Sequence, residues 1–178
     1  AEGKIILADF ETEWWTWCDR LDVDTYPDPE VIEFSVGRFI GLKIDAEKDD
    51  GPELGDLYNV QGYPTIVFLN NQGNEIDRVV GYHPPEQFLD ELRRIHAGKG
   101  TLTDLKSKYE KDSTNFSILF KLSQKYDMMG NNNVARKYIK KIINNDVDSA
   151  GTAIFYDHLY GARESGNPDP LIEFAEKT

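Results

Sequence analysis

One apolar run near the start of the chain constrains the fold more than any other feature. Residues 4–10, Lys-Ile-Ile-Leu-Ala-Asp-Phe, are almost continuously apolar, which is typical of a strand buried on both faces of a parallel sheet. The turn that follows at residues 14–18, Trp-Trp-Thr-Trp-Cys, holds all three tryptophans and the only cysteine. Ligand sites of open α/β sheets lie at the carboxyl ends of strands, so this turn is the first candidate site.

The next segments alternate between strand and helix patterns. We expect further strands at residues 38–45, 63–69 and 75–80, and helices at residues 16–23, 28–36, 54–60 and 85–96. Asn and Gly in the loop 70–74 tolerate the positive φ of a tight turn, so the last two strands should run antiparallel. The sequence therefore predicts an α/β fold with a mixed four-stranded sheet and flanking helices.

A domain boundary is expected at residues 97–100, Ala-Gly-Lys-Gly, because only helical periodicity follows. The charge balance changes as well: residues 1–60 hold 16 Asp and Glu against 5 Lys and Arg, a net charge of −11, while residues 101–178 hold 11 of each. We expect an α/β domain at residues 1–98 and a small all-α domain at residues 101–178. The acidic field disfavours nucleic acid and favours basic or neutral partners; the alternative, which we favour, is that the acidic loops only keep the domain soluble.

Several kinds of site are absent from the sequence. A run of eighteen apolar residues does not occur, which argues against membrane insertion, and a single cysteine excludes an internal disulfide. The acidic loop 45–51 fails the spacing of a calcium-binding EF-hand, and the three histidines have no metal-ligand spacing with Cys18. We expect no metal and no cofactor; the oligomeric state stays open.

Three motifs resemble those of the thioredoxin family in order and spacing. Residues 9–18 begin Asp-Phe, have Trp14 at the family position, and resemble D-F-x-x-x-W-C-x-x-C. Residues 62–65, Gly-Tyr-Pro-Thr, resemble the family's cis-proline loop, and residues 81–82, Gly-Tyr, resemble the end of its last strand. Residues 28–32 further resemble thioredoxin-like proteins related to disulfide isomerases. The resemblance covers about residues 4–97 and implies a thioredoxin-like fold.

The resemblance also assigns roles to the turn. The family's attacking thiol falls at Trp15, and its more buried resolving thiol falls at Cys18. Indole cannot attack a disulfide, so a dithiol cycle is not expected. Cys18 is either a monothiol or a small buried side chain that packs the helix on the sheet, and we favour the second interpretation.

Asp9 matches the buried carboxylate that serves the family as proton acceptor for the resolving cysteine. An Asp in an apolar strand destabilises the fold unless it is paired, so it is either functional or an inherited acid held by hydrogen bonds. Burial should raise its pKa.

The family's cis-proline loop presents backbone groups to an extended peptide, a role that needs no cysteine. Exposed aromatic side chains are enriched at binding sites. Trp14 is expected to pack in the core and Trp15 to be exposed. We therefore favour a module that binds a protein or peptide partner through Trp15, Trp17, Tyr63, Pro64 and Tyr82.

The alternative is an enzyme: a thiol-disulfide oxidoreductase or isomerase relative that acts through Cys18, with Asp9 as proton acceptor. Thioredoxin-like domains of this subtype are often exported in bacteria, so the resemblance favours an extracytoplasmic location. The first strand begins almost at Ala1, so we also expect that a native element upstream is missing.

The helical half carries a second resemblance. Residues 122–135 resemble one tetratricopeptide repeat, with small residues where its two helices cross, and residues 150–165 and 170–177 could form a degenerate second pair. Val147 stands where that family usually has proline. We expect a small helical domain that offers a second docking surface.

Overall fold

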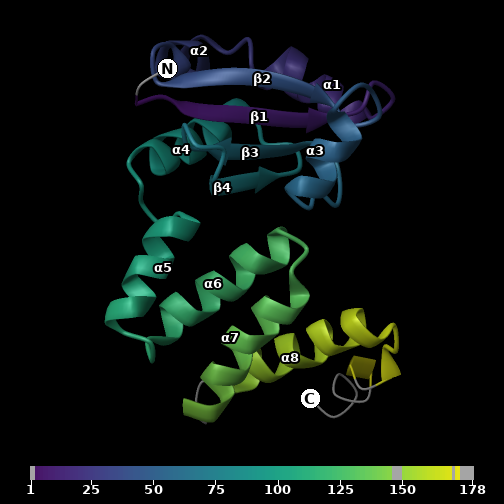
Figure 1. Cartoon of the computed structure of the whole chain (residues 1–178), viewed down its shortest axis with the longest axis vertical. Coiled ribbons are helices and arrows are strands. Elements are labelled where there is room, and N and C mark those ends of the chain that lie inside the picture. Colours follow the sequence, from purple (N-terminus) through teal and green to yellow (C-terminus); the bar gives the residue numbers. More distant parts are fainter. Residues whose placement is uncertain (1–2, 146–149, 170, 173–178) are drawn as a thin grey trace. The chain divides into compact units, whose positions relative to one another are not determined.

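The computed structural model describes residues 3–145, 150–169 and 171–172. The chain divides into two compact units, Ala1–Asp104 and Leu105–Thr178. The first unit holds the sheet with its helices, and the described part of the second is helical (Figure 1).

The sheet of the first unit has four strands in the order β2-β1-β3-β4. They are β1 (Ile5–Glu11), β2 (Phe39–Asp45), β3 (Thr65–Leu69) and β4 (Glu75–Val80). β1 pairs parallel with β2 and antiparallel with β3, and β4 pairs antiparallel with β3. The two central strands are buried on both faces, which explains the apolar run in β1. The predicted mixed four-stranded sheet is confirmed.

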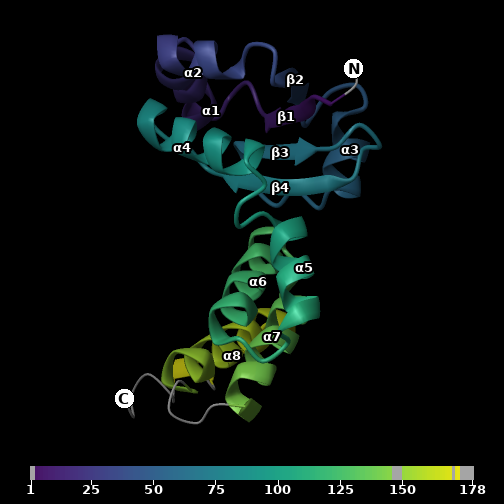
Figure 2. The same ribbon diagram turned by 90° about the vertical axis from the view of Figure 1, so that its left-hand side faces the viewer.

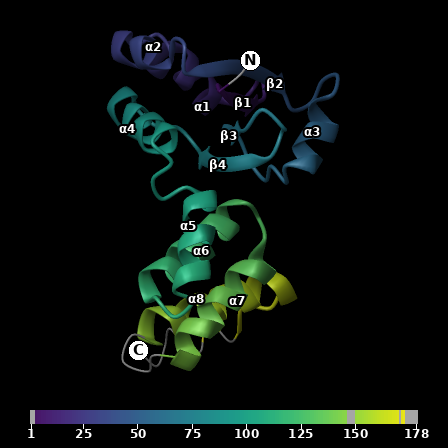
Figure 3. The ribbon, with the colours of Figure 1, turned by 60° about the vertical axis from the view of Figure 1, so that its left-hand side comes forward.

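Helices cover both faces of this sheet (Figure 3). Side chains of α2 (Pro29–Ser35) and α4 (Pro85–His96) pack on the face that carries Leu7, while α3 (Gly51–Leu57) lies on the face that carries Ala8 and Phe10. Alternate residues of a strand point to opposite faces, so β1 contributes to both cores. The buried positions of α4 are the predicted ones: Phe88, Leu89, Leu92 and Ile95.

The helix after β1 changes its hydrogen-bonding pattern part of the way along. α1 (Thr16–Arg20) is α-helical, and it continues as the π-helix η1 (Leu21–Thr25). The amide of Tyr26 donates to the carbonyl of Leu21 over 2.8 Å, the five-residue step of a π turn. The 3.6-residue periodicity used on the sequence does not register this widened turn, which is why the helix ends later than residue 23.

Two helix starts illustrate how local sequence sets the fold. At α2, Oδ1 of Asp28 accepts from the amides of Glu30 (2.9 Å) and Val31 (3.2 Å), as expected for a capping carboxylate before Pro29. α3 begins at Gly51, earlier than residue 54. A Cβ at position 51 would lie 1.8 Å from the backbone oxygen of Asp45, so only glycine lets a helix begin that close to the end of β2.

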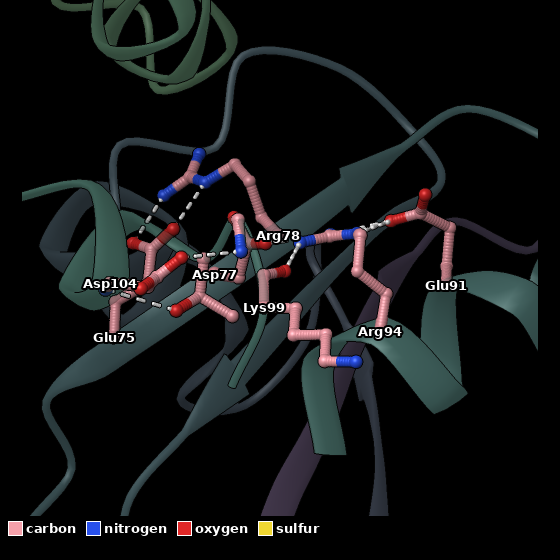
Figure 4. A network of polar contacts seen from close by, with 9 residues as sticks. Glu75, Asp77, Arg78, Glu91, Arg94, Lys99 and Asp104 are labelled. Carbon is pink, nitrogen blue, oxygen red and sulfur yellow. Dashed lines mark hydrogen bonds and ion pairs between the residues drawn. The ribbon is translucent and has the colours of Figure 1, made fainter. Parts of the chain in front are cut away.

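A buried ion pair anchors β4. The guanidinium of Arg78, 2% exposed, donates two hydrogen bonds of 2.7 Å to the carboxylate of Glu75 (Figure 4). It also donates to the carbonyls of Tyr58 (2.6 Å) and Asn59 (3.3 Å). Arg78 therefore joins the hairpin to the end of α3, and each of these contacts offsets part of the free-energy cost of burying the charge.

Arg94 connects α4 to β4 and to the segment that follows the helix. It donates to the carboxylate of Asp77 (2.7 Å) and to the carbonyl of Lys99 (3.1 Å), and the amide of Gly100 donates to Asp104 (2.7 Å; Figure 4). The structure thus groups residues 99–104 with the first unit, whereas the sequence places the domain end at residue 98. Where the independently folding part ends stays a prediction.

The second unit is built from helices that fold back on one another (Figure 2). α5 (Leu102–Lys111) leads into it, and α6 (Phe116–Met128), α7 (Asn132–Asn145) and α8 (Ala150–Ser165) follow. Their shared core contains Leu119, Ala135, Ile139, Ile142, Ala153 and Tyr160. The predicted helical domain is confirmed, while the tetratricopeptide resemblance stays a prediction. Most of the helix expected at residues 170–177 lies outside the described residues.

Candidate functional site

The turn after β1 places three indole rings at the surface. Trp14, Trp15 and Trp17 are 62%, 40% and 46% exposed. The rings of Trp14 and Trp15 meet edge to face with centroids 5.6 Å apart, and we call them the Trp14–Trp15 pair. Large aromatic side chains gathered in water mark a contact surface, so the turn remains the candidate site.

The expectation that Trp14 packs in the core is wrong. Its ring is the most exposed of the three, and its indole N–H donates to Oε2 of Glu47 over 2.9 Å. An indole N–H needs an acceptor, and the acidic loop after β2 supplies one. Cys18 and Leu21, 3% and 1% exposed, fill the core beneath the turn instead.

Trp17 contacts Tyr82, which lies two residues past the end of β4. Their ring centroids lie 5.7 Å apart, and the guanidinium carbon of Arg20 lies 5.9 Å from the Trp17 ring and 5.3 Å from the Tyr82 ring. Arg20 pairs with Asp24 at 3.0 Å, and the Tyr82 hydroxyl donates to the same carboxylate at 3.4 Å. We call these four residues the Trp17–Tyr82 site. The cation beside its two rings was not predicted, because neither Arg20 nor Asp24 belongs to a family motif.

The cis-proline loop reaches the same region through the backbone. The Tyr63–Pro64 bond is cis, and the carbonyl of Pro64 accepts from the amide of Gly81 over 2.8 Å. Gly81 precedes Tyr82, so this bond connects the loop to the Trp17–Tyr82 site. The half-buried Tyr63 ring packs against the core that contains Phe10. Among the described residues, no backbone hydrogen bond engages the amide or carbonyl of Tyr63.

Cys18 lies under the turn, away from solvent. Burial raises the pKa of its thiol, a hydrogen bond to the backbone of Thr12 opposes that shift, and the negative charge of Asp9 adds to it. At neutral pH the side chain is therefore a thiol, whereas the thiolate is the nucleophile. This geometry matches that of a packing side chain better than that of a reactive one.

Asp9 is 4% exposed, and its two carboxylate oxygens differ in their hydrogen bonding. Its Oδ2 accepts a 2.7 Å hydrogen bond from the hydroxyl of Tyr26, and its Oδ1 has no hydrogen-bond partner among the described residues. Burial raises the pKa of Asp9 to about 6, and the bond from Tyr26 opposes this shift. The sequence predicts the buried acid but not its hydrogen-bond partner Tyr26, because the π turn that positions Tyr26 leaves no pattern in the sequence.

Two further features bear on ligands. A pocket of about 380 Å³ lies beside β2, and Asp9, Tyr26 and mainly apolar side chains line it. In the described part of the chain, no group of three or more His, Cys, Asp and Glu residues could hold a metal ion. Nor is any helix there long and apolar enough to span a bilayer.

A mixed sheet with helices on both faces, and a cis-proline loop joined through Gly81 to the turn after β1, defines a thioredoxin-like domain. The family model described as a thioredoxin-like domain matches residues 1–96, more than half of the chain. The chain therefore belongs to the thioredoxin-like family.

Its relatives include proteins of disulfide exchange. Residues of this chain are 36% identical over 100 positions to the thiol:disulfide interchange protein DsbD of Tatumella citrea, which covers 54% of this chain and 17% of that protein. The chloroplastic thioredoxin-like protein HCF164 of Oryza sativa subsp. japonica is 32% identical over 102 positions, covering 57% of this chain and 38% of that protein. The chain thus spans well under half of either relative.

Among solved structures, the chain is similar to a thioredoxin. The solution structure of a thioredoxin from Thermus thermophilus is 30% identical, covers 52% of this chain and 74% of its own, and has a TM-score of 0.48. The part of this chain after residue 104 lies outside the matched family domain.

Proposed function

We propose that the thioredoxin-like domain binds an extended segment of another polypeptide and does not run a dithiol cycle. One observation carries this proposal: exposed indoles occupy the turn where the family has its attacking thiol, while the single thiol of the chain is 3% exposed. Aromatic side chains with polar handles favour recognition of a partner, and a buried thiol of raised pKa disfavours attack on a disulfide.

The bound segment would use two kinds of contact. Tyr63 offers its backbone amide and carbonyl, so an extended peptide can pair with the loop by strand addition. Tyr82 and Trp17 offer apolar area that is connected to the loop through the Pro64–Gly81 bond, and Trp15 offers more in the same turn. Main-chain pairing supplies affinity for any extended chain, and the aromatic rings select side chains.

The alternative is a monothiol oxidoreductase that acts through Cys18. One observation favours it: Asp9 has a pKa of about 6 and its charge acts on Cys18, so a proton acceptor is in place. The names of the relatives also point to disulfide exchange. The burial of Cys18 weighs against this function, because an incoming disulfide must reach the sulfur to be attacked.

Calorimetric titration of the protein with a permanently unfolded, carboxymethylated polypeptide tests the proposal. We expect saturable binding that Trp15→Ala weakens by about 10-fold, as for a central aromatic contact. Ile32→Ala, which removes an exposed apolar side chain of α2, is the matched control and should leave the affinity unchanged. Cys18→Ala should bind as the wild type does.

Two results would overturn the proposal. One is equal binding by the wild type and Trp15→Ala. The other is turnover in an insulin-reduction assay at a rate comparable with a dithiol thioredoxin, which Cys18→Ala abolishes; that result would establish the monothiol enzyme.

We also infer an extracytoplasmic location. The support is that a single buried cysteine has no partner within the chain, so an oxidising compartment leaves the fold unchanged. Cell fractionation of the full-length protein in its source organism checks this, and recovery with cytoplasmic markers would refute it.

A further inference from the structure

In the Trp17–Tyr82 site, two aromatic rings and a carboxylate together bind a cation. Arg20 lies over both rings, at 5.9 Å and 5.3 Å, and its charge is matched by Asp24 at 3.0 Å. A guanidinium in this setting gains both from the ring quadrupoles and from the ion pair.

The Trp14–Trp15 pair brings together the same kinds of group, two aromatic rings and a carboxylate, in an edge-to-face arrangement and without a cation. Its rings lie 5.6 Å apart, and the Glu47 carboxylate is fixed beside them by the indole N–H of Trp14 at 2.9 Å. Among the described residues, no Lys or Arg lies over either ring. The two residues are 62% and 40% exposed, so part of each side chain is accessible to a partner.

The residues around the Trp14–Trp15 pair carry an excess of negative charge, which favours a positively charged ligand. Lys48 is the nearest cation in the loop, and it is held by Glu13 at 2.5 Å and Asp45 at 2.9 Å, so it does not neutralise Glu47. Residues 45–53 hold five Asp and Glu against one Lys, and residues 11–25 hold five against one Arg. Each stretch has a net charge of −4, and Arg20 in the second is already engaged by Asp24.

We propose that the Trp14–Trp15 pair with Glu47 takes an Arg or Lys side chain of the bound polypeptide. This specificity rests on the proposed polypeptide binding and goes beyond it, because strand addition and apolar contact do not discriminate by charge. Arg should bind better than Lys, since its planar guanidinium stacks on rings while it donates to a carboxylate.

The test uses the full chain and a series of acetylated, amidated peptides that share one extended apolar sequence and differ at one central position. That position is Arg, Lys, citrulline or Glu; citrulline keeps the shape of arginine without its charge. We expect Arg to bind about 3-fold to 10-fold more tightly than citrulline at low salt, the difference to shrink as salt rises, and Glu to bind most weakly.

Two matched variants locate the contact. Glu47→Gln keeps an acceptor for the indole of Trp14 but removes the charge, so the Arg-to-citrulline ratio should fall toward one while the citrulline peptide binds as before. Glu53→Gln removes one exposed charge from α3, at a residue with no recorded contact to the pair, and should preserve most of the ratio.

Each outcome decides one question. Binding of all peptides with equal affinity would overturn the charge specificity and leave polypeptide binding intact. A preference for Arg that Glu47→Gln and Glu53→Gln reduce equally would overturn the local site in favour of the general acidic field. Failure of every peptide to bind would overturn both proposals. Concentration-dependent self-association that Trp14→Ala abolishes would show that a second copy covers the pair, and would overturn this assignment.

Discussion

The hydroxyl of Tyr26 donates a 2.7 Å hydrogen bond to Asp9, and among the described residues no other side chain donates a hydrogen bond to this buried carboxylate. The bond lowers the pKa of Asp9, burial raises it more, and the result is a pKa of about 6 against an ordinary value of 3.8. The relationship couples the helix after β1 to the central strand, so it connects the stability of the domain to pH.

Asp9→Asn should therefore change how stability depends on pH. Between pH 3.8 and about 6 the folded protein binds more protons than the unfolded chain, so the free energy of unfolding falls as the pH rises through this window. Asn has no charge to bury, and from pH 4 to pH 7 the variant should gain about 2 kcal/mol relative to the wild type. Urea unfolding of both proteins at the two pH values measures this.

Tyr26→Phe is the companion variant. It removes the hydroxyl and keeps the ring, so the pKa of Asp9 should rise further and the protein should lose about 1–3 kcal/mol at neutral pH. An Asp9→Asn difference that is the same at pH 4 and pH 7 would contradict the raised pKa.

Cys18 should react slowly in the folded protein. A disulfide probe such as 5,5′-dithiobis(2-nitrobenzoate) needs an accessible thiolate, and this thiol is buried with a raised pKa. We expect labelling at neutral pH to be slower than in the denaturant-unfolded chain by at least about 100-fold, as expected for a site that opens only by unfolding. Labelling of the folded chain at the unfolded rate would show that the sulfur is exposed.

Trp15→Cys restores the family tetrapeptide at residues 15–18. The amide of Cys18 already donates to the carbonyl of residue 15 over 2.8 Å, so the two Cβ atoms start from one helical turn at the beginning of α1. On mild oxidation the variant should form an intramolecular disulfide, detected by mass spectrometry as the loss of two hydrogens and of both free thiols. Trp17→Cys, with its thiol beside residue 18 rather than one turn away, is the control that should not close a ring readily.

Glu75→Gln should destabilise the domain more than a matched carboxylate change in α4. Arg78 is 2% exposed, and among the described residues Glu75 is the acid that pairs with it. Without Glu75 its charge is buried and unpaired, so the free energy of unfolding should fall by about 3 kcal/mol. Glu91→Gln is the control: Arg94 keeps Asp77 and is partly exposed, so the loss should stay below about 1 kcal/mol. Equal losses in urea unfolding would contradict the role assigned to Arg78.

Residues 1–98 and residues 1–104 should both melt cooperatively as isolated fragments. The longer fragment should be more stable by about 1–2 kcal/mol, because it retains the bonds from Arg94 to Lys99 and from Gly100 to Asp104. Calorimetry of the two fragments measures the difference. If the shorter fragment lacks a cooperative transition, the predicted domain end at residue 98 is wrong.

Local pattern was enough to predict most of the first domain. The strands, the capping carboxylate Asp28 and the helix at residues 85–96 each depend on neighbours in sequence, and the structure has them where predicted. α3 and the helix after β1 are exceptions: the early start at Gly51 depends on a close approach to Asp45, and the late end at Thr25 depends on a π turn, neither of which a local pattern encodes.

The misses at the candidate site have a common physical origin. Trp14 was the tryptophan expected to pack in the core, but its indole N–H donates to Glu47, 33 residues away in the sequence. The partner of Asp9 and the cation of the Trp17–Tyr82 site likewise depend on polar contacts made across the fold. Hydrophobic periodicity indicates which residues are buried, but it does not indicate which polar groups form hydrogen bonds or ion pairs.

The grouping of every tryptophan in one exposed turn also gives the protein a built-in optical reporter. All of its indole emission originates within residues 14–17, and none comes from the hydrophobic core or the helical unit. Unfolding should therefore shift the emission maximum little, since the rings are in water beforehand. A bound polypeptide should exclude water from those rings and shift the tryptophan fluorescence spectrum to the blue, so binding can be followed without an added label.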